Sequence, residues 1–319
     1  MRAIPLLTLL VTGWFVVPAY ADEAQDWLAR LSQAEQQQSF QGTFVYERNG
    51  SFSTHNIWHR VQDGKVRERL LQLDGSAQEV VRIDGHTQCV SGSLVAGLGD
   101  TPDSSARALD PQKLKNWYDL AVIGKSRVAG RPAVIVSLTP RDQHRYGFEL
   151  HLDRETGLPL KSLLLNDKGQ LLERFQFTRL DTAEIPAERD LQASIECKAV
   201  TLDNDKALAV KTAQVWHSDW LPPGFELSSS SARKDPETKV QVSSLMYDDG
   251  LARFSVFLEP LNGAVVTDTR TQLGPTVAVS RRLTTPNGEM MVTVVGEIPI
   301  GTAERIALSM RADTTAAKQ

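Results

Sequence analysis

The sequence has little of several features that mark common classes of protein. It contains two cysteines among 319 residues, which is too few for a disulfide-rich scaffold or a structural zinc site. Its formal net charge of −4 argues against a nucleic-acid partner, which would need a concentrated basic face. No H-E-x-x-H, G-x-S-x-G, P-loop or dinucleotide-binding glycine pattern occurs. The sequence therefore predicts neither an enzyme nor a bound cofactor or metal.

Long apolar runs are also absent after the N-terminus. Arg2 precedes a largely apolar run from residue 4 to 17, and Pro18 and the small-x-small pattern Ala19-Tyr20-Ala21 follow it. This order is typical of a secretory signal peptide, and the run is too short for a stable transmembrane helix. We expect a signal peptide over residues 1–21, cleaved after Ala21, and a mature protein in the periplasm.

The two cysteines, Cys89 and Cys197, have two interpretations that the sequence leaves open. In an oxidising compartment they could pair, or each could remain a small buried thiol. If they pair, the closed loop exceeds 100 residues, and the chain-entropy model then gives about 4 to 5 kcal/mol of stabilisation.

The first part of the mature chain predicts one helix followed by many strands. Apolar residues at helical spacing predict a helix that begins near Ala24. From residue 40 to 90, short β-rich runs alternate with four turn dipeptides, which is typical of an antiparallel meander. These dipeptides are Asn49-Gly50, Asp63-Gly64, Asp74-Gly75 and Asp84-Gly85. Asp110 as a cap and Pro111 predict a second helix, with Leu114, Trp117, Tyr118 and Ala121 on one face, before strands resume.

Composition changes near residue 197, where the chain becomes polar and poor in aromatic residues. We expect a first domain over residues 22–197, a linker over 198–212, a second domain over 213–312 and a tail over 313–319. The serine-rich stretch 228–239 predicts an exposed loop, and a closing helix is expected from about Thr302. Strands dominate both domains, so the fold class is α+β.

The stretch YGFELHLD raises the question of a site. In a strand, His151 and Asp153 project to the same side, about 6.6 Å apart. At this distance the two side chains could share a metal ion or act as an acid/base pair. A second group of ligands is missing, so we expect a solvated strand face instead.

Apolar residues at alternate positions in the strands of the first domain predict one face of a long curved sheet. This face either forms an ordinary core under helices or a groove for an acyl chain or an extended peptide. The candidate residues are Phe44, Tyr46, Trp58, Leu70, Phe148, Leu150, Phe175 and Phe177.

Several blocks of the sequence resemble one family. QGTFVYERNG, RVAGRPAVIVSLTPRDQHRYGFELHLDRETGLPLKS, WLPPGFEL, MYDDGLARFSVFLEP and MVTVVGEIP occur in the order found in the RseB/MucB family of periplasmic sigma-factor regulators. The resemblance extends from about residue 40 to 310.

The resemblance implies a fold and a function. It implies a first domain similar to the outer-membrane lipoprotein carriers, an incomplete antiparallel barrel with helices across its opening, and a smaller second domain with one helix. It implies a negative regulator that binds the periplasmic region of a single-span anti-sigma factor, protects it from proteolysis, and is released by lipid or lipopolysaccharide in the envelope stress response and alginate synthesis.

The family transfers no catalytic residue. The residues of the distinctive second-domain blocks are candidates for partner contact, although core packing explains them as well. They are Trp220, Leu221, Pro222, Phe225, Tyr247, Phe254 and Phe257. A lipid or lipoprotein carrier without a regulatory partner is the alternative function, and the sequence leaves a homodimer open.

Overall fold

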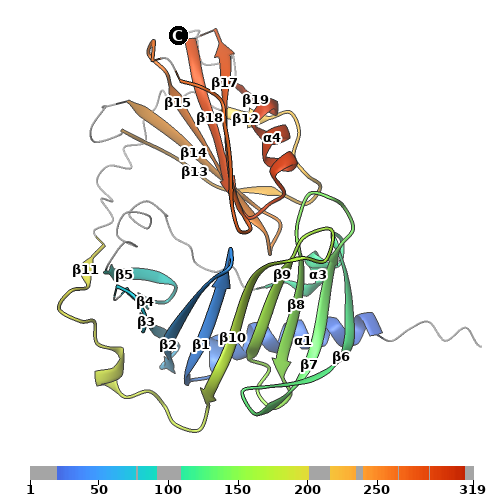
Figure 1. Cartoon of the computed structure of the whole chain (residues 1–319), viewed down its shortest axis with the longest axis vertical. Helices are drawn as coiled ribbons and strands as arrows, with labels where there is room; N and C mark the ends of the chain where they lie inside the picture. Colours follow the sequence, from blue (N-terminus) through green and yellow to red (C-terminus); the bar gives the residue numbers. More distant parts are fainter. Residues whose placement is uncertain are drawn as a thin grey trace, which may run out of the picture.

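The computed structural model describes residues 20–76, 78–91, 109–200, 216–234, 240–264, 266–286 and 288–312. Most of the predicted signal peptide, most of the predicted linker and the predicted tail lie outside these residues. The described chain forms two large antiparallel sheets and one two-stranded sheet, and the second large sheet is stacked on one end of the first (Figure 1). We call α1 to β11 the first domain and β12 to β19 the second. Within the described ranges, no helix is both long and apolar enough to cross a membrane.

The first domain is built on an eleven-stranded sheet. Its spatial order is β11-β5-β4-β3-β2-β1-β10-β9-β8-β7-β6, so two consecutive meanders meet where β1 pairs with β10. The strands are β1 (Phe40–Arg48), β2 (Ser51–Gln62), β3 (Lys65–Gln72), β4 (Glu79–Ile83), β5 (His86–Val90), β6 (Tyr118–Val128), β7 (Arg131–Pro140), β8 (Gly147–Asp153), β9 (Pro159–Leu165), β10 (Leu171–Asp181) and β11 (Lys198–Ala199). The sheet is open, because β11 and β6 stand at its two ends.

The predicted turn dipeptides account for the first meander. Asn49 and Gly50 join β1 to β2 with φ angles of 52° and 74°, and Asp63 and Gly64 join β2 to β3 with 52° and 73°. Positive φ at both central residues gives the turn twist that matches paired strands. The meander predicted from the sequence is therefore confirmed.

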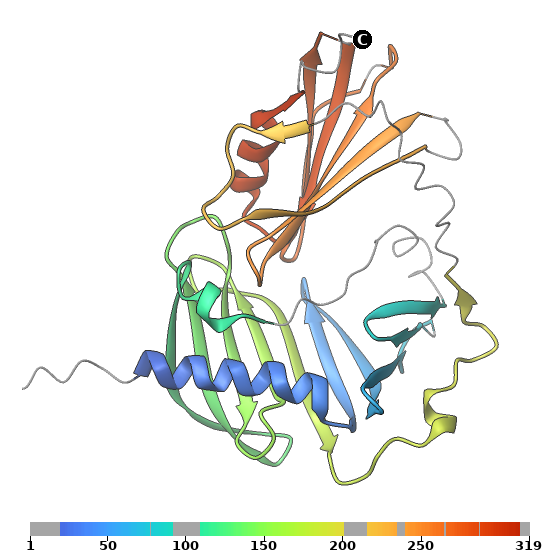
Figure 2. The same ribbon diagram turned by 180° about the vertical axis from the view of Figure 1, so that it is seen from behind.

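Helix α1 (Tyr20–Gln37) crosses the sheet in front of β6 to β10 (Figure 2). Its residues Ala24, Leu28 and Leu31 pack in a core with residues of β6, β7 and β8, and Ala34 belongs to a neighbouring core that includes Phe40. The helical spacing read from the sequence thus marks the face that packs on the sheet.

The second predicted helix is shorter than expected. Asp110 does cap it, because its carboxylate accepts hydrogen bonds from the backbone N–H groups of Gln112 and Lys113, and Pro111 takes the first position. However, α3 (Pro111–Leu114) ends after four residues, and Tyr118 begins strand β6. The helix expected to continue over residues 115–121 was wrong. From Tyr118 onwards, ten residues of β6 pair with β7, and this pairing outweighs the helical spacing of the apolar residues.

The end of the first domain runs back across the outer face of β2 to β4. In the 3-10 turn η2 (Glu188–Leu191), Glu188 pairs with Arg60 and Arg67, and Leu191 is buried. A disulfide between Cys89 and Cys197 closes this segment, and residues 198 and 199 of the predicted linker then form β11. We call residues 182–199 the strap.

The second domain contains a six-stranded sheet covered on one face by one helix. Its order is β13-β14-β15-β18-β17-β16, and β12 pairs separately with β19. The elements are β12 (Trp216–Ser218), β13 (Glu226–Lys234), β14 (Gln241–Asp248), β15 (Arg253–Pro260), β16 (Thr269–Leu273), β17 (Thr276–Thr285), β18 (Gly288–Gly296), α4 (Ile300–Ser309) and β19 (Met310–Ala312). Ala303, Ile306 and Ala307 of α4 are buried in the core, and the helix expected from about Thr302 begins at Ile300.

The serine-rich stretch of this domain differs from the expectation. Residues 228–239 were expected to form an exposed loop, but residues up to Lys234 belong to β13, which pairs with β14 at the edge of the sheet. An edge strand tolerates serine because one of its sides faces solvent, so composition alone does not exclude a strand there. Both domains are antiparallel sheets with few helices, which confirms the α+β class.

Candidate functional site

The two domains meet at a loop of the first domain that enters the second. The loop Asp142–Tyr146 joins β7 to β8, and we call it the plug loop. Arg145 is its central residue, and its side chain has no exposed surface. Its guanidinium pairs with Asp142 at 2.9 Å and with Asp249 of the β14–β15 turn, and it also donates to the carbonyl oxygen of Pro223. A buried guanidinium needs such partners, because desolvating an unpaired charge is highly unfavourable.

Aromatic rings from both domains surround this ion pair. The Arg145 guanidinium lies 5.7 Å from the Trp117 ring, 5.6 Å from that of Tyr118 and 5.1 Å from that of Phe225. The hydroxyl of Tyr118 donates to Asp249 at 3.2 Å. Burial raises the pKa of Tyr118 and the Asp249 carboxylate raises it further, so the phenol stays a neutral donor.

A glycine allows the closest approach between the domains. Gly224 has a φ of +86°, and a Cβ at this position would overlap the ring of Trp117. The turn Pro222-Pro223-Gly224 thus lets the second domain pack against the end of α3. This role of the LPPGF block is structural, and it explains why the block requires glycine.

The other residues of the plug loop also contact the second domain. The Tyr146 hydroxyl donates to the carbonyl oxygen of Ile298 at 3.2 Å. His144 Nδ1 lies 3.1 Å from Thr302 Oγ1 in the first turn of α4. Together with Arg145, these contacts place the plug loop against three segments of the second domain.

A second contact lies at the tip of the β1–β2 hairpin. Arg48 donates to Thr276 Oγ1 at the start of β17, and its guanidinium is 3.7 Å from Glu297 and 4.0 Å from Glu173. The Arg48 and Glu297 side chains are 30% and 46% exposed. This contact is therefore weaker than the buried pair at Arg145.

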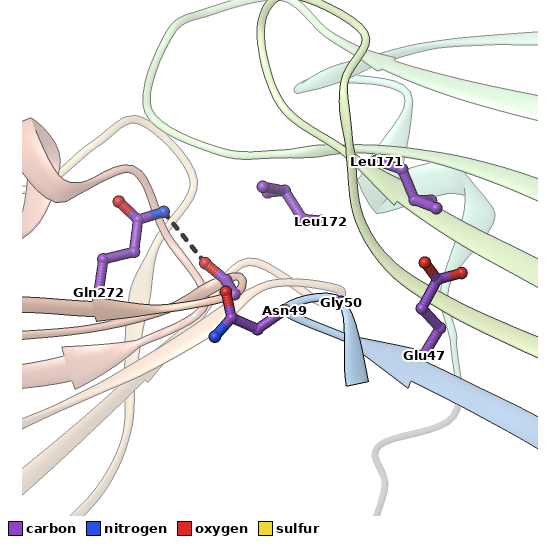
Figure 3. Close-up of a pocket in the computed structure, with 7 residues that line it drawn as sticks. Glu47, Asn49, Gly50, Leu171, Leu172 and Gln272 are labelled. Atoms are coloured by element: carbon purple, nitrogen blue, oxygen red, sulfur yellow. Dashed lines mark hydrogen bonds between the residues drawn. The ribbon is translucent and has the colours of Figure 1, made fainter. Parts of the chain in front are cut away.

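Pockets lie on both sides of this hairpin and include residues of both domains. One has a volume of about 380 Å³ and lies between the hairpin, the start of β10 and the β16–β17 turn (Figure 3). Its lining residues are Glu47, Asn49, Gly50, Leu171, Leu172, Gln272 and Gly274. Gln272 Nε2 donates to the carbonyl oxygen of Gly274 at 3.0 Å, which fixes the turn. Amide, carboxylate and leucine side chains in one hollow suit an extended peptide.

The other pocket, of about 400 Å³, continues the inner face of the first domain. Tyr46, Arg48, Ser53 and Gln72 line it, together with Leu273 of the second domain. Deeper in the sheet, the rings of Phe44 and Phe175 have centroids 4.6 Å apart.

The structure brings together most, but not all, of the predicted apolar face. Phe44, Tyr46, Leu70, Phe175 and Phe177 share one cluster, in which Tyr46, Leu70 and Phe175 are only partly buried. Leu150 and Phe148 belong to the adjacent core under α1 and α3. Trp58 departs from the expectation: it alternates with His59, whose ring stacks on Phe40 on the inner face, so it lies on the outer face beside Arg69.

The predicted partner-contact residues lie mostly in the core of the second domain. Phe225, Tyr247 and Phe254 are 5%, 3% and 1% exposed. Trp220 and Leu221 are partly buried against the same core, Pro222 is buried, and Phe257 is half-buried on the opposite face of β15. Trp220 lies beside the plug loop, since its ring centroid is 5.1 Å from that of His144.

The strand face around His151 is not solvated, contrary to the prediction. His151 is 5% and Asp153 is 0% exposed. His151 is held by Ser126 and Glu149, whereas Asp153 accepts hydrogen bonds from Arg131 and Thr156. Their partners are long or polar side chains of adjacent strands and turns, which cover the face. Among the described residues, no group of three or more potential ligands is placed to hold a metal ion.

The role of the plug loop as the contact between the domains was missed by sequence reasoning. Arg145 stands 104 residues from Asp249, and no local pattern reports a contact over that separation. Tyr146 and Phe148 follow Arg145 at the start of β8, and this local pattern does not mark a contact between domains.

Comparisons with known proteins agree in both domains. Family models described as the MucB/RseB N-terminal domain and C-terminal domain match residues 23–196 and 210–311. The sigma factor AlgU regulatory protein MucB of Pseudomonas aeruginosa is 62% identical over 100% of both chains. The sigma-E factor regulatory protein RseB of Escherichia coli K12 is 29% identical, over 95% of this chain and 96% of RseB.

Solved structures of MucB agree with this chain in sequence and in fold. The complex of Pseudomonas aeruginosa MucA/MucB is 63% identical with a TM-score of 0.81, and covers 92% of this chain and 100% of that chain. A structure described as MucB, with no partner named, is 60% identical with a TM-score of 0.69, and covers 92% of this chain and 98% of that one. With both family models matching in order and a relative this similar along its full length, the chain belongs to the MucB/RseB family of sigma-factor regulatory proteins.

Proposed function

We propose that this protein is a periplasmic negative regulator of an envelope-stress sigma factor, and that it acts by binding the periplasmic region of a membrane-spanning anti-sigma factor. The observation that carries the proposal is the match to the MucB of the MucA/MucB complex, at 63% identity through both domains. At that identity the surfaces that contact a partner are expected to be largely retained. The name of the full-length relative, a regulatory protein of a sigma factor, supports the same function.

The arrangement of the domains adds support. TM-scores are 0.81 and 0.80 with the two MucB structures that include MucA, but 0.69 with the structure described as MucB alone, at equal coverage of this chain. A difference of this kind at nearly equal identity is what a change in domain orientation would produce. We infer that the plug loop contacts described above belong to the arrangement that binds the partner.

The protein is proposed to act on its partner by covering it, not by catalysing a reaction. A protease cleaves a segment that it can hold in an extended form, so a partner segment held against both domains would be protected. The pocket between Asn49, Leu171 and Gln272 offers such a surface. We therefore propose protection from proteolysis, and no enzymatic activity of the protein itself.

Release by a lipid or lipopolysaccharide is proposed for the inner face of the first domain. Tyr46, Leu70 and Phe175 are only partly buried there, which leaves apolar surface available for an acyl chain. Leu273 of the second domain lines the pocket that continues this face. An acyl chain that displaced Leu273 would disturb the domain arrangement, and the two ligands would then oppose each other.

The test is a calorimetric titration of the purified protein with the periplasmic region of the anti-sigma factor from the same organism. We expect saturable binding, slower cleavage of the bound region by a site-specific protease, and loss of binding when lipopolysaccharide is added. Phe175→Asp should remove the lipopolysaccharide effect but retain partner binding. Trp58→Asp on the outer face of the same sheet is the matched control and should retain both.

The outcomes separate the proposals. No binding of the anti-sigma region at neutral pH would refute the regulatory function. Stoichiometric lipid in the purified protein without any binding of the anti-sigma region would favour the alternative, a periplasmic lipid or lipoprotein carrier. Binding and protection that lipopolysaccharide does not change would refute only the lipid signal.

A further inference from the structure

A histidine of the plug loop is inserted into the surface of the second domain. His144 Nδ1 lies 3.1 Å from the hydroxyl of Thr302, which is itself only 4% exposed. The His144 ring meets the Trp220 ring edge to face, with centroids 5.1 Å apart. The guanidinium of Arg305 covers the same Trp220 ring at 3.8 Å. The partly buried His144 is therefore contacted by two separate segments of the second domain.

The charged groups that act on His144 are Asp142, Arg305 and Arg145, and Arg145 is paired with Asp142. Burial lowers the pKa of His144, Asp142 opposes this effect, and Arg305 and Arg145 lower the pKa further. Thr302 belongs to the first turn of α4, whose N-terminus carries a partial positive charge that disfavours a nearby cation. From the β14–β15 turn, Asp249 faces this region only through Arg145, to which it is paired.

We propose that protonation of His144 weakens the docking of the second domain on the first, so that mild acid loosens the junction between the domains. A protonated ring would place a third cation beside Arg145 and Arg305, in a site that water reaches only in part. Separation of the domains would return the ring to solvent and remove this repulsion. The junction thereby acts as a pH-sensitive contact, independent of any bound partner.

The sign of the effect follows from the direction of the shift. In the docked state the pKa of His144 is lowered, so the docked protein binds fewer protons than the separated one. Docking is therefore fully stabilised above the pKa of a solvated histidine, about 6.5. The stabilisation decreases as the pH falls below that value, and it stops decreasing below the lower pKa of the docked state.

Other histidines with a lowered pKa provide the control. His151 is buried, whereas His144 is partly buried, and desolvation lowers the pKa of both, but the hydrogen-bond partners of His151 are Ser126 and Glu149 of the first domain. Protonation of His151 should therefore affect only the first domain, whereas protonation of His144 should affect the contact between the domains. Substitution of each by glutamine separates the two effects.

The experiment is small-angle X-ray scattering of the full mature protein between about pH 7.5 and about pH 5, a window that spans the usual histidine titration. We expect the radius of gyration to rise reversibly on acidification in the wild type and in His151→Gln, and to stay constant in His144→Gln. Glutamine keeps a hydrogen-bonding group near Thr302 but has no charge to gain, so this variant is expected to fold and dock.

A second measurement keeps the proposal open to refutation if the glutamine variant fails to dock. The pKa of His144 in the wild-type protein is read from a nuclear magnetic resonance titration of the histidine ring signals. A value at or above about 6.5 would overturn the proposal. So would a radius of gyration that does not change with pH in the wild type, or one that changes equally in wild type and His144→Gln.

Discussion

Arg145 of the first domain and Asp249 of the second form an ion pair in which neither side chain has any exposed surface. Asp249 also accepts hydrogen bonds from the Tyr118 hydroxyl and from the backbone N–H groups of Leu251 and Ala252. A carboxylate with four donors orders the β14–β15 turn and the junction at the same time. Asp249 is therefore one of the residues that fix the relative position of the domains, and local sequence patterns do not mark it.

Asp249→Asn is expected to lower the free energy of unfolding by about 3 kcal/mol, at the lower end of the range for breaking a buried pair, because Arg145 keeps Asp142 as a partner. Denaturant unfolding followed by circular dichroism measures the change. The control is Lys113→Ala, which removes an exposed interdomain pair with Glu226 and should change stability by less than about 1 kcal/mol. Equal losses in the two variants would contradict the assigned role of the buried pair.

The disulfide that closes the strap is expected to stabilise the fold. The disulfide between Cys89 and Cys197 joins residues 108 apart, so the chain-entropy model assigns it about 4 to 5 kcal/mol. We expect the double variant Cys89→Ser, Cys197→Ser to lose stability by that order in a denaturant titration, and the wild type to lose as much when reduced. A wild type that unfolds at the same denaturant concentration with and without reductant would show that the strap is held by Glu188 and Leu191 instead.

Sequence reasoning succeeded where structure is encoded locally. The dipeptides Asn49-Gly50 and Asp63-Gly64 adopt the positive φ angles that their residue types favour, and Asp110 caps α3 as expected. Sequence reasoning failed where pairing between distant segments determines the secondary structure. The predicted helical spacing continued to Ala121, but pairing with β7 from Tyr118 onwards made the segment a strand.

The candidate site illustrates the same limit. His151 and Asp153 do project to one side of β8, as alternation requires. Their burial depends on Arg131, Ser126 and Thr156, which other turns and strands bring to them, and no period in the sequence encodes that. The disulfide likewise depends on how the strap crosses the sheet, which composition leaves open.

Asp153 gives a pH-dependent prediction in the acidic range. Burial alone would raise its pKa, but hydrogen bonds from Arg131 and Thr156 outweigh burial and hold the pKa below its usual value. The native state thus binds fewer protons, and Asp153 stabilises the fold above the pKa of an unfolded aspartate, about 3.9. This contribution is lost as the pH falls from there through the lower native pKa.

Asp153→Asn should therefore be less stable than the wild type at neutral pH, and the difference should shrink on acidification below about pH 4. Thermal unfolding at a series of pH values checks this. Asp119→Asn is the control, because Asp119 forms an exposed pair with Arg141 that should contribute little at any pH. A constant difference between wild type and Asp153→Asn across the acidic range would contradict the prediction.

Two phenylalanines of β15 separate packing from partner contact. Phe254 is 1% exposed and its ring stacks on Tyr247 with centroids 5.1 Å apart. Phe254→Ala should lower the free energy of unfolding by about 3 to 5 kcal/mol. Phe257 projects from the opposite face of the same strand and is half-buried, so Phe257→Ala should lose about 1 kcal/mol.

The same two variants test the predicted contact residues when binding of the anti-sigma region is measured alongside unfolding. Weaker binding by Phe254→Ala is expected only to the extent that the variant is unfolded, since its side chain is not available to a partner. Weaker binding by a fully folded Phe257→Ala would instead assign the outer face of the six-stranded sheet to the partner. Unchanged binding by that variant would remove Phe257 from the contact surface and leave the junction between the domains as the remaining candidate, because the predicted residues Trp220 and Phe225 lie beside the plug loop.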